Sequence, residues 1–266
     1  MNIPLAGALL VCVLASRAVA QTVPIAGRLP ERPAQASSPA PRLADGRPDL
    51  GNGKGAWNPR VIANLAGVGG PGRSPVETIV DVPFQAWAKA VYELRQTNLQ
   101  QHDPESRCLP PGLPRLMATP FPFQIFQQSD RVLFVFEGGA HVWRAIYTDG
   151  RGHPKDPNPS FLGDSIGRWD GATLVVDTTN FRPDTHNVDS GERLHVVERF
   201  MRIDATTMRY RVTAEDPDTW TTPWTAEWPF KATDRRVFAA ECHEGNRAIE
   251  GFLRGARAEE RERQKP

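Results

Sequence analysis

The sequence predicts a mainly β protein in which one antiparallel meander forms a lipocalin-like barrel or a two-sheet sandwich. After Pro122, about nine short runs rich in β-branched and aromatic residues are separated mostly by two to five turn-forming residues. Links this short join antiparallel neighbours, and no helices alternate with the runs as a parallel α/β sheet would require. A meander of this length tends to close on itself or to divide into two packed sheets. The runs are FQIFQQ, RVLFVFE, HVWRAIYTD, LGDSIGRWDG, TLVVDTTNF, RLHVVERFMRID, TMRYRVTAED, WTAEWPFKA and RRVFAAECHE.

Two helices are expected outside the meander. Residues 83–101 carry apolar side chains at steps of three and four, which predicts an amphipathic helix with Pro83 in its first turn. The apolar face of this N-terminal helix contains Phe84, Trp87, Ala90, Val91 and Leu94. After Ile249, a short C-terminal helix is expected to run into a charged tail, residues 251–266.

The first 20 residues are predicted to be a secretory signal peptide. An apolar run from Leu5 to Ala15 is followed by Ala18 and Ala20, the small residues that precede a cleavage site. The apolar run is too short to span a bilayer comfortably. We therefore expect a periplasmic or secreted protein, with no membrane insertion after the signal is cleaved.

The mature chain is predicted to hold one domain behind an arm. Residues 21–75 are rich in Pro, Gly, Ala and Arg without a sustained period, which indicates an arm or disordered linker with Trp57 packed against the body. Residues 76–250 contain the first helix and all the strand-like runs. They are expected to form a single β-rich domain.

The balance of charges indicates which classes of partner the protein can attract. The chain has 32 basic and 31 acidic residues, and loss of Arg17 with the signal leaves 31 of each. A neutral protein with interspersed charges produces no long-range field that would attract polyanions. We therefore expect a small-molecule ligand rather than nucleic acid or an anionic membrane surface.

A proline-rich strap, HDPESRCLPPGLPRL, carries one of the two cysteines that remain after signal cleavage. In an oxidising compartment, an isolated pair is most simply a disulfide, here Cys108–Cys242. The chain-entropy relation then gives an upper stabilisation of roughly 5 kcal/mol for so long a loop. The alternative is a reactive Cys108 thiolate stabilised by a neighbour such as Arg107.

Acid–base candidates lie on three strand-like runs. The base would be His141 or His195, and the carboxylate that orients it would be Glu198 or Glu241. Developing negative charge would be stabilised by Arg144 or Arg199, and a proton would come from Tyr147. Alternation assigns each residue to a strand face but leaves open which face is interior. The alternative is hydrogen-bonded strand histidines and surface ion pairs.

No motif for a nucleotide, a metal or an α/β-hydrolase elbow is present. A zinc site formed by His141, His195 and His243 is geometrically conceivable, but no spacing requires it. We therefore predict no metal and no cofactor.

Candidate ligand contacts come from one long loop and from aromatic residues. Residues 149–171 form a proline-stiffened segment of a length typical of binding loops or lids, although a stiff connector is the alternative. Trp224 and Trp228 share strand parity, so they pack together in the core or stack on a sugar or aromatic ligand. The remaining candidates are Trp143, His153, Asp164, Ser165 and Trp169.

Several long strings resemble a family of bacterial exported β-rich proteins. They are DPESRCLPPGLPRLM, HVWRAIYTDGRGHP, DSIGRWDGATLVVDTTNF and LHVVERF, together with the helix PFQAWAKAVYELRQTN. The resemblance covers about residues 76–248 and implies export and a compact β-rich body, but it supplies no catalytic residues. A likeness to lipocalin-type barrels depends only on the number of strands.

Three functions follow from these observations. The first is an exported enzyme that acts on a small apolar or aromatic molecule in a barrel pocket by metal-free acid–base chemistry, as a lyase, isomerase or hydrolase. The second is a ligand carrier with the same barrel and no turnover. The third is a carbohydrate-binding protein that uses its tryptophans.

Overall fold

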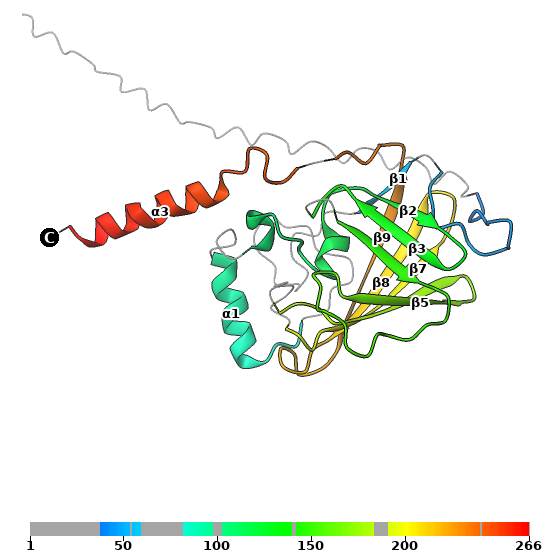
Figure 1. The fold of residues 1–266 in the computed structure, drawn as a ribbon, viewed down its shortest axis with the longest axis horizontal. Helices are drawn as coiled ribbons and strands as arrows, with labels where there is room; N and C mark the ends of the chain where they lie inside the picture. The colour runs from blue at the N-terminus through cyan, green and yellow to red at the C-terminus, as the bar shows by residue number, and fades with distance from the viewer. Residues whose placement is uncertain are drawn as a thin grey trace, which may run out of the picture. The chain divides into compact units, whose positions relative to one another are not determined.

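The chain forms a closed nine-stranded β-barrel in a computed structural model that describes residues 38–53, 55–59, 82–97, 103–139, 142–183, 191–239 and 241–265 (Figure 1). This confirms the predicted mainly β, lipocalin-like class. The strands are β1 (Ala56–Pro59), β2 (Phe123–Gln127), β3 (Arg131–Phe136), β4 (Trp143–Tyr147), β5 (Asp164–Asp170), β6 (Thr173–Thr179), β7 (His195–Arg202), β8 (Thr207–Glu215) and β9 (Trp224–Thr233). The predicted signal peptide, residues 1–20, lies outside the described residues.

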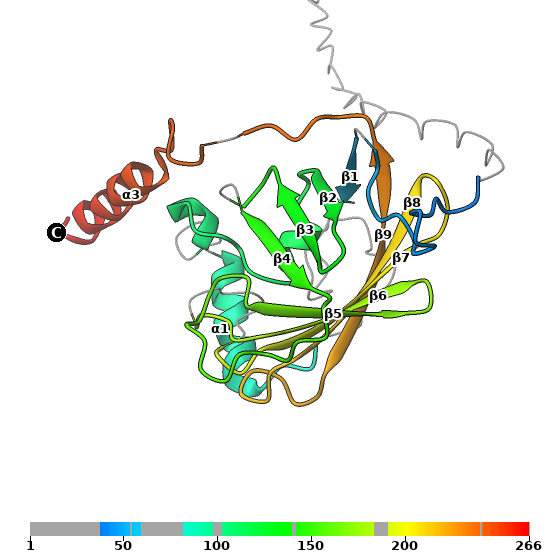
Figure 2. The same cartoon turned by 45° about the vertical axis from the view of Figure 1, so that its right-hand side comes forward.

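The barrel closes through β1, which pairs with both β2 and β9 (Figure 2). The prediction of an arm over residues 21–75 is wrong for this part of the chain, although Trp57 is fully buried as expected. A four-residue strand that follows a glycine-rich turn and ends at Pro59 has too short a pattern to be recognised. Its pairing comes from two strands more than sixty positions further along the chain. Residues 21–37 and 60–75 lie outside the described residues.

One pair of strands departs from the predicted antiparallel meander. β4 and β5 are parallel, so residues 148–163 must carry the chain from one end of the barrel to the other. A parallel connection needs about a dozen residues or more, and this link is long enough to supply them. Residues 149–171, predicted to be a binding loop or a stiff connector, are therefore a crossover segment followed by β5.

The run RRVFAAECHE does not form the predicted last strand. Its described residues have no strand structure, and Phe238 is exposed. Both edges of β9 are already bonded, to β8 and to β1, so this run has no strand edge to pair with. It continues as an irregular segment that contains Cys242.

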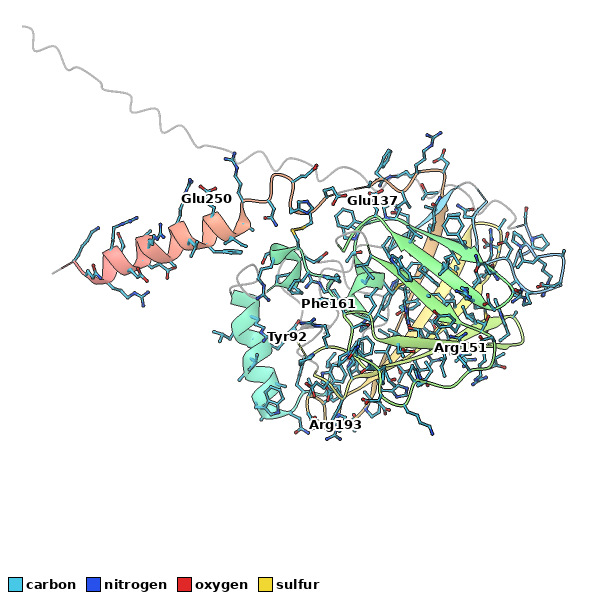
Figure 3. The ribbon with its side chains drawn as sticks, in the orientation of Figure 1. Tyr92, Glu137, Arg151, Phe161, Arg193 and Glu250 are labelled. Atoms are coloured by element: carbon cyan, nitrogen blue, oxygen red, sulfur yellow. A yellow bond between two sulfur atoms is a disulfide. The ribbon has the colours of Figure 1, made fainter. Side chains whose placement is uncertain are left out.

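The N-terminal helix α1 (Ala86–Thr97) is present, but the predicted apolar face is wrong. Ala88 and Tyr92 are buried, whereas Trp87 and Leu94 are exposed. Tyr92, which Figure 3 labels, stacks on Phe84. The indole of Trp87 donates to the carbonyl of Asp218, and the two contacts fix the helix in this rotation. The predicted end of the helix, residues 98–101, lies outside the described residues.

The C-terminal helix α3 (Ala248–Arg263) is longer than predicted, because it continues through most of the charged tail. Ion pairs four residues apart, Arg254 with Glu250 and Arg263 with Glu259, favour helix in this segment. None of its described residues is buried.

The barrel core is mostly aromatic. Inward side chains on β5–β9 form transverse rows because the strands pair in register. One row contains large residues: Trp169, Leu174, Phe200, Tyr210 and Trp228. From the opposite wall, Phe134 packs at a tilt against this row, with its ring centroid 5.1 Å from that of Phe200.

Each mouth of the barrel is covered by a segment of chain. At the mouth where β4, β5, β7 and β9 begin, residues 103–122 form a strap with two short 3-10 helices, η1 (Pro104–Arg107) and η2 (Arg115–Ala118). The strap buries Leu116, and the indole of Trp228 donates to the carbonyl of Met117 at 3.2 Å. At the far mouth, Arg202 donates to the carbonyls of Asp49 and Gly51.

The disulfide between Cys108 and Cys242 is present, as predicted (Figure 3). It joins the strap to the irregular segment after β9 rather than to a last strand. Cys108 is therefore not a free thiolate, and the disulfide links the strap covalently to the segment that follows β9.

Candidate functional site

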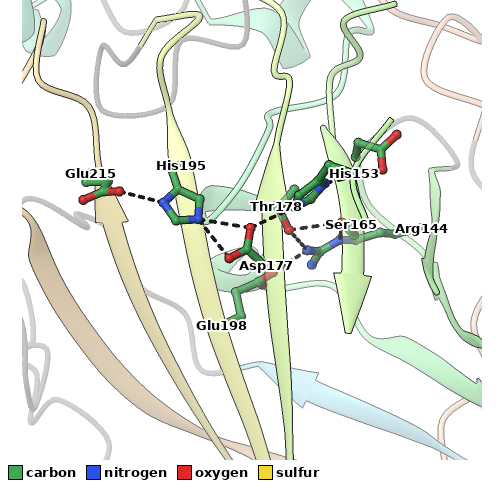
Figure 4. Close-up of polar contacts among 9 residues, drawn as sticks. Arg144, His153, Ser165, Asp177, Thr178, His195, Glu198 and Glu215 are labelled. Atoms are coloured by element: carbon green, nitrogen blue, oxygen red, sulfur yellow. Dashed lines mark hydrogen bonds and ion pairs between the residues drawn. The ribbon is translucent and has the colours of Figure 1, made fainter. Parts of the chain in front are cut away.

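An ion pair lies inside the barrel wall. Alternation along β4 and β7 turns Arg144 and Glu198 inward, and their side chains are 2% and 0% exposed. The Nη2 of Arg144 donates to Oε2 of Glu198 (Figure 4). The pair crosses two intervening strands, because β5 and β6 lie between β4 and β7.

Three hydroxyl groups complete this inner network, which consists of Arg144, Ser165, Thr178, Glu198 and Tyr210. Arg144 donates from Nε to Oγ of Ser165 at 3.0 Å and from Nη2 to Oγ1 of Thr178 at 2.7 Å. The hydroxyl of Tyr210 donates to Oε1 of Glu198 at 2.9 Å. Burial, with the neighbouring Glu198 carboxylate, raises the pKa of Tyr210 well above its usual value, so the phenol stays protonated.

One atom of the inner network has no hydrogen-bond partner in the described part of the chain. The Nη1 of Arg144 is buried and makes no hydrogen bond within the described part of the chain. The indole nitrogens of Trp220 and Trp224 are also buried and make no hydrogen bond within the described residues, and the two ring centroids are 5.4 Å apart. Buried charges and donors without partners are costly, and such groups point to a functional site.

A second group of polar residues lies on the outer face of the same wall. This outer cluster consists of His153, Asp177, His195 and Glu215 (Figure 4). Nε2 of His195 is 3.1 Å from both carboxylate oxygens of Asp177, and Nε2 of His153 is 2.9 Å from Oδ1 of Asp177. His153 belongs to the crossover segment, so the cluster attaches that segment to β6.

The contacts of His195 define its protonation state. Its Nδ1 is 2.7 Å from Oε1 of Glu215, while its Nε2 faces Asp177. Ionised carboxylates only accept hydrogen bonds, so these contacts favour the imidazolium form, in which both ring nitrogens donate. Partial burial alone would lower the pKa of His195, but hydrogen bonds to Glu215 and Asp177 outweigh it and raise this pKa.

The outer cluster should therefore make stability depend on pH. A raised pKa in the folded state means that His195 stabilises the fold fully below its unfolded pKa of about 6.5. This contribution is lost as the pH rises through the raised folded pKa. Urea unfolding between pH 6 and 9 should show the wild type losing stability relative to His195→Gln, and parallel profiles would contradict the assignment.

Asp177 contributes with the opposite sign. Partial burial would raise the pKa of Asp177, but hydrogen bonds with His153 and His195 outweigh it and lower this pKa. Its stabilisation is present above its unfolded pKa and is lost as the pH falls through the lowered folded value. Urea unfolding of the wild type and of Asp177→Asn, continued down to pH 3, measures this contribution. The wild type should lose stability relative to the variant as the pH falls.

The structure divides the predicted catalytic residues between the two faces of the wall. Glu198 and Arg144 are inside, whereas His195 is outside and is oriented by Asp177 and Glu215 instead of Glu198. Among the predicted alternatives, an orientation of His195 by Glu198 is wrong, because residues three positions apart on one strand point to opposite faces. Nor does Arg199 reach the network, since it points outward and pairs with Asp170 at 2.8 Å.

The other polar candidates are scattered. Tyr147 lies between two guanidinium groups, with Arg151 3.9 Å and Arg131 5.3 Å from its ring centroid. Glu241 is exposed beside Cys242, away from both groups of residues. His141 lies outside the described residues.

Most of the predicted ligand-contact residues do not belong to the inner network. Trp143 is on the outer face of β4 and is 66% exposed. Trp224 and Trp228 are each 3% exposed and pack in the core, so they do not form the exposed aromatic row that a carbohydrate-binding protein would need. Ser165 is in the inner network, and Trp169 packs inward against the core. Oδ1 of Asp164 is 3.8 Å from Nδ1 of His153, which belongs to the outer cluster.

Sequence reasoning missed Tyr210, Thr178, Asp177 and Glu215. The alternation in TMRYRVTAED already placed Tyr210 on one face with Val212 and Ala214. That signal becomes useful only when the register with β7 is known, because Glu198 pairs with Val212, one row from Tyr210.

The fold and these residues define a lipocalin-like β-barrel with a charged network enclosed in its wall. Comparisons with protein-family models, with curated proteins and with solved structures find no match. The resemblance to a family of exported proteins therefore stays a prediction. Within the described ranges, no three or more His, Cys, Asp or Glu side chains are grouped to hold a metal ion, and no helix is long and apolar enough to cross a membrane.

Proposed function

We propose that this is an exported protein that binds a small, largely apolar molecule inside the barrel, beside the inner network, without turning it over. The observation that carries this proposal is the buried Arg144–Glu198 pair, whose Nη1 donor has no partner among the described residues. Replacing a buried ion pair by apolar residues is often neutral or stabilising. A barrel with only a structural role has no evident need for the pair.

The size of the neighbouring side chains supports this location. The inward row that contains Glu198 is otherwise small, with Val176, Val212 and Ala226, while Ile146 and Leu174 fill the space over Gly167. The row nearer the strap is also mostly small: Ser165, Thr178, Val196, Ala214 and Trp224. The row of large aromatic side chains follows next to the Glu198 row, on the side of the far mouth. A ligand beside Arg144 would therefore meet small apolar side chains, one tryptophan and a few polar groups, the usual lining of a small-molecule site.

Binding fits the inner network better than catalysis does. Both oxygens of Glu198 already accept hydrogen bonds, from Tyr210 and Arg144, so this carboxylate is not free to act as a base. The raised pKa of Tyr210 keeps its phenol from ionising near neutral pH. The two histidines that contact carboxylates in the described ranges, His153 and His195, lie on the outer face of the barrel, across the wall from this site.

Export is part of the proposal because of the disulfide. Disulfides persist in oxidising compartments and are rare in the cytosol. The Cys108–Cys242 bond thus agrees with the signal-like sequence at the N-terminus.

Native mass spectrometry of the protein, expressed with its own N-terminus and gently purified, tests the proposal. We expect a non-covalent adduct that disappears on denaturation and is identified in an organic extract. The variant Ala226→Leu fills the proposed site and should lose the adduct, whereas Thr225→Leu, its outward-facing neighbour on β9, should keep it. An adduct that survives in Ala226→Leu, or a wild-type protein that neither carries an adduct nor takes up an added apolar probe, would contradict the proposal.

A further inference from the structure

We propose that the ligand presents a neutral oxygen acceptor, such as a ketone, ester or amide carbonyl, to the Nη1 of Arg144. This inference depends on the proposed binding function and specifies the chemistry of the molecule bound. It runs against the usual expectation that a buried arginine selects a carboxylate.

Apart from the Thr148 hydroxyl, which can donate or accept, the buried atoms of the barrel interior without a partner among the described residues are donors. Arg144 offers Nη1, and Trp220 and Trp224 each offer an indole N–H that has no acceptor among the described residues. Guanidinium and indole nitrogens cannot accept hydrogen bonds. The hydroxyls of Ser165 and Thr178 are already bonded to Arg144 and to each other. A molecule that satisfies these groups must bring an acceptor.

The charge of the inner network determines which kind of acceptor is favoured. Glu198 already neutralises Arg144, and the phenol of Tyr210 remains uncharged. The other inward arginine on β7, Arg202, is bound to backbone carbonyls at the far mouth. A carboxylate ligand would therefore leave one net negative charge buried in the wall, which is strongly unfavourable.

A carbonyl oxygen avoids this penalty. It accepts from Nη1 and leaves the network neutral. A hydrogen bond from a charged donor to a buried acceptor contributes about 1.5–3 kcal/mol, which is roughly a 10- to 100-fold change in affinity. The apolar remainder of the ligand would contact the small side chains of the neighbouring rows.

The test compares three probes of one shape: 2-acetonaphthone, 2-ethylnaphthalene and 2-naphthoate. Binding to the wild-type protein is measured at pH 7.5 through the change in tryptophan fluorescence. We expect the ketone to bind at least about tenfold more tightly than the hydrocarbon, and the carboxylate to bind most weakly. A carboxylate that binds most tightly would overturn the inference.

A matched variant shows whether Arg144 is responsible for the preference. Removing one partner alone could unfold the protein, so the double variant Arg144→Met/Glu198→Leu removes both charges together. This variant should lose the preference for the ketone over 2-ethylnaphthalene. Arg199→Met, an outward change next to Glu198 on the same strand, should leave the preference intact.

The outcomes separate the inference from the proposed function. If 2-ethylnaphthalene binds as tightly as the ketone, the site exists but the neutral-acceptor inference is wrong. If the preference survives in the double variant, Arg144 is not the donor. If none of the three probes binds and no adduct is found by mass spectrometry, the proposed function itself is wrong.

Discussion

Replacing Glu198 with Leu is expected to lower the free energy of unfolding by about 3–5 kcal/mol. The substitution leaves the guanidinium of Arg144 buried without its counter-charge, and an arginine cannot relieve this by losing a proton. It also removes the acceptor of the Tyr210 hydroxyl, which is fully buried. Urea unfolding followed by tryptophan fluorescence measures the change.

Two further variants make this result interpretable. Arg144→Met/Glu198→Leu should recover most of the lost stability, because no uncompensated charge remains. Arg199→Met affects a half-exposed pair with Asp170 and should change the free energy of unfolding by only about 0–1 kcal/mol. If the double variant were as unstable as Glu198→Leu, the destabilisation would not come from an unpaired buried charge.

Loss of the disulfide should have an effect of similar size. Cys108 and Cys242 are 134 positions apart, so reduction releases a large loop in the unfolded chain. The chain-entropy relation gives an upper limit of about 5 kcal/mol for a loop of this length, and typical values are 2–4 kcal/mol. The variant Cys108→Ser/Cys242→Ser should therefore unfold at a clearly lower urea concentration than the oxidised wild type.

Reduction of the wild type supplies the control for this prediction. With dithiothreitol present, the wild type should match the double serine variant, while the variant itself should not respond. The prediction is contradicted if the oxidised protein and the double serine variant unfold at the same urea concentration.

The strands from β2 to β9 could be predicted from the sequence because each has its own alternation and its own turn residues. Closure of the barrel could not, because it depends on Trp57 and three neighbours whose pairing partners are distant in the chain. For the same reason, VFAAEC looked like a strand. Its composition favours β structure, but every neighbouring edge is already occupied.

The candidate site was predicted in part. Alternation correctly separated Glu198 from His195 and Arg144 from Trp143, but it did not show which set faces the interior. The difficulty is physical: both faces of β7 carry charged residues, with Glu198 and Arg202 on one and His195 and Arg199 on the other. Only the register across β4–β8 shows that Arg144 and Glu198 neutralise each other and can therefore be buried together.

A crystal structure of the protein soaked with 2-acetonaphthone tests the central claim most directly. We expect the naphthyl ring inside the barrel, with its ketone oxygen about 2.7–3.2 Å from Nη1 of Arg144. Water alone at Nη1, with the probe bound outside the barrel or absent, would contradict the claim that the inner network is a ligand site.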